Sequence, residues 1–270
     1  MKNIITLICL IGLISCASNQ RRKEDKQGMI FYNQGTQELA DGEYTIALTH
    51  LQQANRMIPD NTHILNNLGM AYYFKGATDR AIKLINKSLE LDSKNTAARM
   101  NLATIELKAK NYKRAEKLYL EILEDLTYMA QFRTYYNLGV LSLQQGRDQS
   151  ALEYFAKALR ENDTYCPAHQ QLGNYYFKKG NYKHALKKYT DATYGTCYNN
   201  PIPHYHKAKA LVKLGEFPKA EQTLNLVMEK FSSSKYFNLA KNELKRINQL
   251  KSSTNEEFDY SDRKILTPSF

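Results

Sequence analysis

The chain has 270 residues, of which 43% are hydrophobic and 24% charged, and its formal net charge is +11 at pH 7. This length allows one or two globular domains, or a single array of repeats that grows along one axis. Lysine and arginine are scattered along the chain, which argues against a nucleic-acid-binding patch and favours a solvated outer face. Attraction to anionic lipid head groups or cell-wall polymer is the alternative role for this charge.

The first 15 residues have the pattern of a secretory signal peptide. Lys2 supplies a positive charge, and Ile4 to Ile14 is apolar apart from Thr6 and Gly12. These eleven residues are too few to cross a bilayer as a helix, which needs about 20. Residues 1–15 are therefore expected to be a cleaved signal.

The four residues Leu13 to Cys16, LISC, resemble the lipobox of bacterial lipoproteins. The resemblance implies that Cys16 becomes the lipidated first residue, and that Ala17, in place of aspartate, directs the protein to the outer membrane. The alternative is an ordinary signal peptide with an incidental cysteine. We expect a lipid-anchored outer-membrane protein facing the periplasm, with residues 16–27 as a flexible tether. Such a protein does not meet the genome, so we expect no nucleic-acid partner.

Residues 28–231 contain six copies of one pattern, in which a small residue is followed by alanine twelve positions later. The pairs are Gly35/Ala47, Gly69/Ala81, Ala103/Ala115, Gly139/Ala151, Gly173/Ala185 and Ala208/Ala220. The successive intervals are 34, 34, 36, 34 and 35 residues. The pattern predicts six units, with the boundaries 28–61, 62–95, 96–131, 132–165, 166–200 and 201–231.

Each unit is expected to be a pair of antiparallel amphipathic helices. The apolar residues recur at helical spacing in both halves of a unit. A glycine separates the two halves in five units, and Lys110 occupies this position in the third, where the chain needs a left-handed residue. One such hairpin cannot bury its apolar face alone, so neighbouring hairpins must stack.

The motif N-N-L-G-x-x-Y at Asn66 to Tyr72, followed by A-x-x-x-I at Ala81 to Ile85, resembles the tetratricopeptide repeat, TPR. The resemblance implies an all-α, right-handed superhelical solenoid of six TPR hairpins. Residues 235–251 are predicted to add a C-terminal capping helix, and residues 252–270 a disordered tail. An unrelated helical bundle with a similar apolar stripe is the alternative.

Two cysteines remain after the signal and the lipidated residue are set aside. Cys166 begins the leading helix of the fifth unit, and Cys197 follows its trailing helix. Because an antiparallel hairpin brings these two ends together, the pair is a candidate disulfide in an oxidising compartment. Two unpaired buried thiols are the alternative.

In the TPR family the leading helices line a concave groove, which implies a partner-binding surface of aromatic residues, methionine, amides and cations. The predicted groove residues are Tyr32, His63, Asn66, Met70, Tyr73, Phe74, Met100, Arg133, Tyr136, Gln170, Asn174, Phe177 and Lys178. The alternative for each is packing against the next unit, which we expect for about half of them. The groove suits an extended peptide or a partner helix.

No catalytic motif is present: the chain lacks Gly-x-Ser-x-Gly, His-Glu-x-x-His and a phosphate-binding glycine loop. His204 and His206 flank Tyr205 without carboxylate or cysteine partners at metal-ligand spacing. We therefore expect no enzyme activity, no cofactor and no metal site.

The order of parts resembles the pilotins of type IV pili, the PilF/PilW/Tgl group. These are outer-membrane lipoproteins with six TPR units that help a secretin ring to insert and multimerise. The resemblance implies a scaffold whose partner is a secretin subunit or another envelope protein. An adaptor similar to NlpI, which brings cell-wall hydrolases and proteases together, is the main alternative, and a metal-binding or enzymatic protein using the histidines is the third.

Overall fold

The computed structural model describes the backbone of residues 2–265 and the side chains of residues 21–195 and 197–252. Over this range the chain is helical and contains no strand, which confirms the all-α prediction. The α-helices are α1 (Lys2–Asp41), α2 (Tyr44–Met57), α3 (Thr62–Phe74), α4 (Thr78–Leu91), α5 (Thr96–Lys108), α6 (Tyr112–Leu123), α7 (Gln131–Gln144), α8 (Asp148–Glu161), α9 (Cys166–Lys178), α10 (Tyr182–Asp191), α11 (Pro201–Lys213), α12 (Phe217–Lys230) and α13 (Lys235–Ile265). A short 3₁₀ helix, η1, spans Gly195–Cys197.

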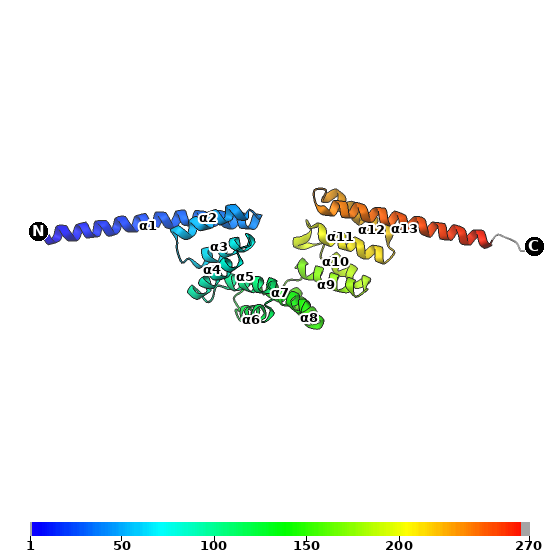
Figure 1. Ribbon diagram of the computed structural model, residues 1–270, viewed down its shortest axis with the longest axis horizontal. Coiled ribbons are helices and arrows are strands. Elements are labelled where there is room, and N and C mark those ends of the chain that lie inside the picture. Colours follow the sequence, from blue (N-terminus) through cyan, green and yellow to red (C-terminus); the bar gives the residue numbers. More distant parts are fainter. Residues whose placement is uncertain (1, 266–270) are drawn as a thin grey trace, which may run out of the picture. The chain divides into compact units, whose positions relative to one another are not determined.

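The chain divides into two compact units, Met1–Met129 and Ala130–Phe270, which are described separately (Figure 1). The first unit contains the hairpins α1/α2, α3/α4 and α5/α6. The second contains α7/α8, α9/α10 and α11/α12, followed by α13. Each hairpin therefore corresponds to one predicted repeat.

Local sequence signals explain where the hairpins begin and turn. The side chain of Asn61 accepts hydrogen bonds from the backbone N–H groups of His63 and Ile64 and so caps α3. The turn after α3 has Gly76 at φ +82°, and the turn after α5 has Lys110 at φ +63°. The left-handed turn predicted at Lys110 is therefore confirmed.

The small residue of each repeat allows its two helices to approach closely. In the first unit a Cβ added to Gly69 would lie 2.7 Å from Cγ1 of Ile85. In the second unit a Cβ added to Gly173 would lie 2.6 Å from the Tyr189 ring. Ile85 is fully buried and Tyr189 is nearly so, because the missing side chain leaves room for a larger one on the trailing helix.

The start of α13 covers the last hairpin of the second unit. Its Ala240 and Ile247 are fully buried in one cluster with Leu224 and Val227 of α12. This is the packing expected of a helix that ends a stack of repeats.

The two ends of the chain differ from the expected tether and tail. Residues 21–27, predicted to be flexible, continue α1, and α13 runs to Ile265, where a disordered tail was predicted to begin at residue 252. Apart from Asp25, residues 21–27 are arginine, lysine, glutamate and glutamine, which propagate a helix well once a packed hairpin has nucleated it, and the segment holds no proline or glycine. The side chains of the predicted signal and of Cys16 lie outside the described residues, and within the described part no helix is long and apolar enough to cross a membrane.

Candidate partner-binding surfaces

A chain of side-chain hydrogen bonds joins the leading helices of the first unit. Asn67 of α3 donates to Oγ1 of Thr36 on α1 at 2.9 Å, and Asn66 donates to Oδ1 of Asn67 at 3.1 Å. Asn101 of α5 donates to Oδ1 of Asn66 at 2.9 Å. Asn66 is only 4% exposed, so this predicted groove residue is used inside the unit and is not available to a partner.

The other predicted residues of the first unit form a partly exposed aromatic surface. Phe74 is 45% exposed and stacks on Tyr44, with ring centroids 4.5 Å apart, while Tyr73 meets its edge at 5.6 Å. His63 is exposed. Three further predicted residues are half-buried: Tyr32, Met70 and Met100. Phe74 and His63 are thus the predicted residues of this unit with the most free surface.

In the second unit, α9, α10 and α11 enclose a pocket of about 210 Å³. It is lined by Asn174, Phe177, Lys178, Tyr189, His206 and Lys209. The first three are predicted groove residues, and the pocket brings them together. The other predicted residues of this unit, Arg133, Tyr136 and Gln170, do not line it.

The pocket wall is aromatic and fixed by internal contacts. The hydroxyl of Tyr189 donates to Oδ1 of Asn174 at 2.9 Å. The Tyr189 ring lies 6.4 Å from that of Phe177 and 5.3 Å from that of His206. Nζ of Lys209 lies 5.6 Å from the Phe177 ring centroid. These contacts hold the rings in place before any partner arrives, which lowers the entropy cost of binding.

The charge of this pocket is positive at neutral pH and comes from its two lysines. Burial, assisted by the nearby ammonium of Lys209, lowers the pKa of His206 from 6.5 to about 4, so its imidazole is neutral. Burial also raises the pKa of Tyr189, which stays protonated. No acidic side chain lines the pocket. It therefore suits an apolar or aromatic side chain with a carboxylate nearby.

Sequence reasoning missed three residues of this pocket. Lys209 follows Ala208 as Asn174 follows Gly173, so the spacing rule used for the earlier units would have found it. Tyr189 lies on a trailing helix, which the rule assigns to packing, and His206 was considered only as a metal ligand.

Comparison with known proteins identifies the repeat. Tetratricopeptide-repeat family models match residues 32–96, 75–127 and 132–165. This chain contains tetratricopeptide repeats. The small residue and the alanine twelve positions later, which recur in each hairpin, belong to this repeat.

The TPR chain is related to type IV pilus biogenesis proteins. It is 23% identical over 197 residues to the type IV pilus assembly protein PilF of Pseudomonas aeruginosa strain PAO1, covering 68% of this chain and 76% of the relative. A solved structure of P. aeruginosa PilF has a TM-score of 0.63 at 22% identity, covering 82% of this chain and 99% of that one. The structure of PilW, described as a widely conserved type IV pilus biogenesis factor, has a TM-score of 0.65 at 16% identity, covering 78% and 97%. At these identities the two structures show the shared fold.

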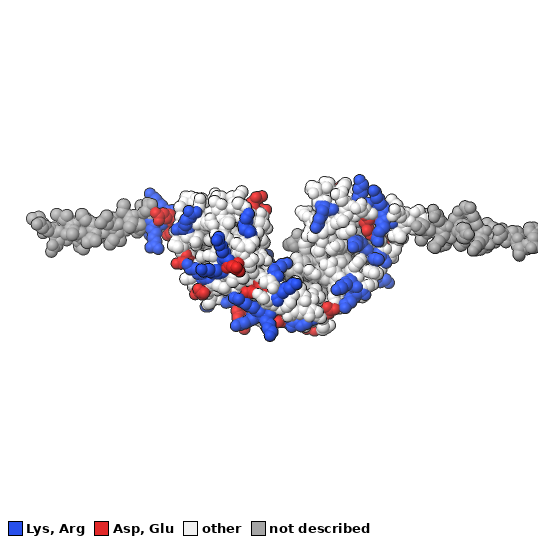
Figure 2. All heavy atoms as spheres, in the orientation of Figure 1, with Lys and Arg blue, Asp and Glu red and all other residues white. Residues whose placement is uncertain are grey.

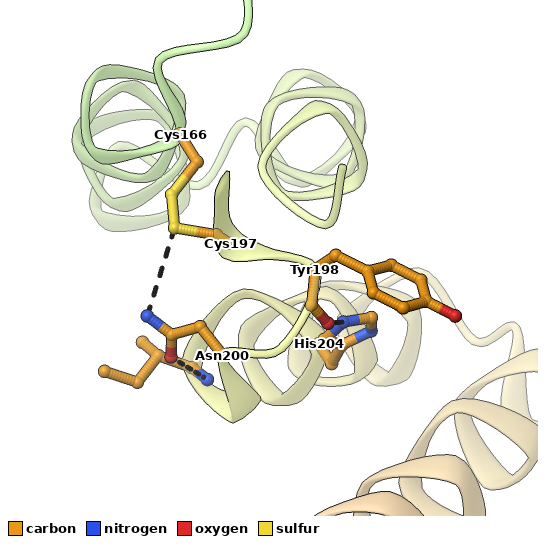
Figure 3. The surroundings of a disulfide bond; sticks show 6 residues. Cys166, Cys197, Tyr198, Asn200 and His204 are labelled. Atoms are coloured by element: carbon orange, nitrogen blue, oxygen red, sulfur yellow. Dashed lines mark hydrogen bonds between the residues drawn. A yellow bond between two sulfur atoms is a disulfide. The ribbon is translucent and has the colours of Figure 1, made fainter. Parts of the chain in front are cut away.

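The structure joins the candidate cysteine pair of the fifth TPR unit as a disulfide (Figure 3). The Cα atoms of Cys166 and Cys197 lie 6.0 Å apart. Asn200, three residues after Cys197, caps α11 by accepting from the N–H of Ile202 at 3.0 Å, and Nε2 of His204 lies 3.3 Å from the carbonyl oxygen of Tyr198. The disulfide connects η1 to the start of α9, and the two hydrogen bonds connect the segment after η1 to α11, the helix that carries His206 and Lys209.

Nothing in the described part of this TPR chain forms a metal centre. No group of three or more histidine, cysteine, aspartate or glutamate side chains in that part is placed to hold an ion. His204 is 9% exposed, and burial lowers its pKa. Lysine and arginine are spread over both units on the face shown in Figure 2, as the sequence suggested.

Proposed function

We propose that this TPR protein is a non-enzymatic scaffold of the cell envelope that assists assembly of a type IV pilus secretin, as a pilotin does. The relation to PilF, which extends over 68% of this chain, carries the proposal. The described surfaces agree with it, because both units offer aromatic side chains on leading helices and neither offers a catalytic cluster.

In this proposal the two ends of the protein have separate tasks. A lipid on Cys16 holds the chain at the outer membrane, facing the periplasm, since several buried acyl methylenes at about 0.8 kcal/mol each give stable attachment. The pocket of α9, α10 and α11 holds a segment of the secretin subunit until subunits assemble. Its rings supply the anchoring contacts, and Lys178 and Lys209 orient an acidic neighbour.

The test is complementation of a strain that lacks the gene. The amount of secretin multimer in isolated outer membranes is measured with the wild-type chain, with Cys16→Ser and with Phe177→Ala. Both variants are expected to reduce the multimer several-fold, while Lys187→Ala, on an exposed residue outside the pocket, leaves it unchanged.

The outcome that contradicts the pilotin proposal is a normal amount of multimer in the strain without the gene. A pull-down from detergent-solubilised envelopes then separates the alternatives. Capture of cell-wall hydrolases and proteases in place of a secretin would favour the NlpI-like adaptor.

A further inference from the structure

A second pocket lies in the first unit, between α2, α3 and α4. Its volume is about 480 Å³, and it contains no residue of the predicted groove. The lining residues are Gln52, Asn55, Arg56, Leu68, Tyr72, Arg80, Lys83 and Leu84. Three of these are basic and none is acidic.

The three cations have no acidic partner among the described residues. Arg80 lies over the Tyr72 ring, with its guanidinium carbon 5.7 Å from the ring centroid. Nε of Arg56 reaches only the carbonyl oxygen of Gln52 in its own helix, at 3.5 Å. Lys83 is exposed. The lining of this pocket is therefore positively charged.

In the next hairpin of the same unit, the arginine equivalent to Arg80 is neutralised. At the position of Tyr72, three residues after the small residue, the next repeat has Glu106, and at the position of Arg80 it has Arg114. Nη1 of Arg114 lies 3.1 Å from Oε1 of Glu106, whose side chain is 2% exposed. At the same position of the repeat, Arg114 thus forms an ion pair with a glutamate of its own hairpin, whereas Arg80 has no acidic partner in the described part of the chain.

The equivalent pocket of the second unit also contains its own acid. It lies between α8, α9 and α10, measures about 530 Å³, and includes Glu153 beside Arg160 and Lys188. Nζ of Lys188 lies 3.7 Å from Oδ2 of Asp191. The unpaired charge is therefore a property of the α2–α3–α4 pocket and does not follow from the repeat.

Two polar atoms in the α2–α3–α4 pocket have unused hydrogen-bonding capacity. The hydroxyl of Tyr72 accepts from Nε2 of Gln52 at 2.8 Å, which leaves its own hydrogen able to donate. Oδ1 of Asn55 is buried without a hydrogen-bond partner, which is costly unless a ligand supplies a donor. Leucine occupies the position of Asn55 at Leu89, Leu123 and Leu159, so packing at this position does not require an amide.

We propose that the α2–α3–α4 pocket binds an anionic saccharide. Arginine and lysine side chains and the Tyr72 hydroxyl donate to its phosphate or carboxylate oxygens, and arginine suits such groups because it can donate two parallel hydrogen bonds. A sugar hydroxyl donates to Oδ1 of Asn55, and the apolar face of the ring packs on Leu68 and Leu84. This site is separate from the groove residues and does not depend on the pilotin proposal.

The test is calorimetric titration of the full-length chain, in a detergent without a sugar head group, with glucose 1-phosphate, glucose and inorganic phosphate as probes. Glucose 1-phosphate is expected to bind more tightly than either fragment. Arg80→Ala and Lys83→Ala should each lower the affinity for glucose 1-phosphate by about tenfold, because hydrogen bonds to charged groups are stronger than those between neutral groups. Lys117→Ala, at the position of Lys83 in the next hairpin, is the matched control and leaves binding unchanged.

A second variant tests the sugar part separately. Asn55→Leu introduces the residue already present at three equivalent positions. It is expected to weaken the binding of glucose 1-phosphate several-fold and to leave the binding of inorganic phosphate unaffected. Circular dichroism confirms that each variant keeps its helix content. The proposal is overturned if glucose binds as tightly as glucose 1-phosphate, if inorganic phosphate alone matches it, or if Lys83→Ala and Lys117→Ala behave alike.

Discussion

The side-chain amide of Asn101 on α5 donates to Oδ1 of the buried Asn66 on α3 at 2.9 Å. Apolar contacts between helices tolerate small sliding movements, whereas a directional hydrogen bond between buried groups does not. This bond therefore fixes how two successive leading helices of the first unit lie against each other.

Replacing Asn101 by leucine should destabilise the first unit by about 1–3 kcal/mol, because Oδ1 of Asn66 then stays buried without a donor. Urea unfolding followed by circular dichroism measures the loss. Asn33→Leu, on the exposed side of α1, is the control. Equal losses in the two variants would show that the bond has no structural role.

The helical hairpins were predictable because their signals are local and repeated. Gly69 and Ala81 mark a close helix contact at every recurrence, and the turn at Lys110 follows from the same register although the residue is not glycine. The role of Asn66 was not predictable, because its partner Asn101 belongs to the next repeat and only the packed unit brings the two amides together. The position of a residue in the repeat predicts that its side chain lies on the groove side of the leading helix. It does not show whether an amide there faces a bound partner or the leading helix of the next repeat.

The pockets show a second limit of the sequence. Asn174, Phe177 and Lys178 were predicted from spacing, but Tyr189 enters the pocket wall from the trailing helix because Gly173 leaves space for its ring. The α2–α3–α4 pocket has no motif at all. Its character depends on the absence of an ion-pair partner for Arg80 among the described residues, and a missing partner becomes visible only when the neighbours are placed in space.

The left-handed turn at Lys110 offers a test of backbone strain. A residue with a Cβ pays roughly 1–2 kcal/mol in this conformation, and glycine avoids that cost while losing more chain entropy. Lys110→Gly should therefore raise the unfolding free energy by about 0.5–1 kcal/mol in urea titrations. Lys117→Gly, in the interior of α6, should lower it by about 1 kcal/mol. A destabilised Lys110→Gly protein would mean that the lysine side chain contributes more than the turn costs.

The disulfide should stabilise the second unit. Cys166 and Cys197 are 31 residues apart, and closing such a loop contributes roughly 3–4 kcal/mol in the chain-entropy model. Reduction with dithiothreitol should lower the unfolding free energy of the wild-type chain by this amount and leave a Cys166→Ala/Cys197→Ala variant unchanged. Free thiols in the untreated protein, together with insensitivity to reductant, would show that the pair is unbonded.

The buried imidazole of His206 should make the stability of the second unit depend on pH. Its pKa is about 4 in the folded chain and 6.5 in the unfolded one, so between these values the unfolded chain binds a proton that the folded chain does not. The contribution of His206 is therefore complete above pH 6.5 and is lost as the pH falls towards 4, by at most about 3 kcal/mol.

His206→Phe keeps an aromatic ring beside Tyr189 and removes the titration. Because His204 and the carboxylates also titrate in this range, the measured quantity is the difference in unfolding free energy between wild type and His206→Phe. That difference should shift in favour of the variant as the pH is lowered from 7 to 4. A difference for His206→Phe that stays constant across this range would place the imidazole in water, outside the aromatic wall of the pocket.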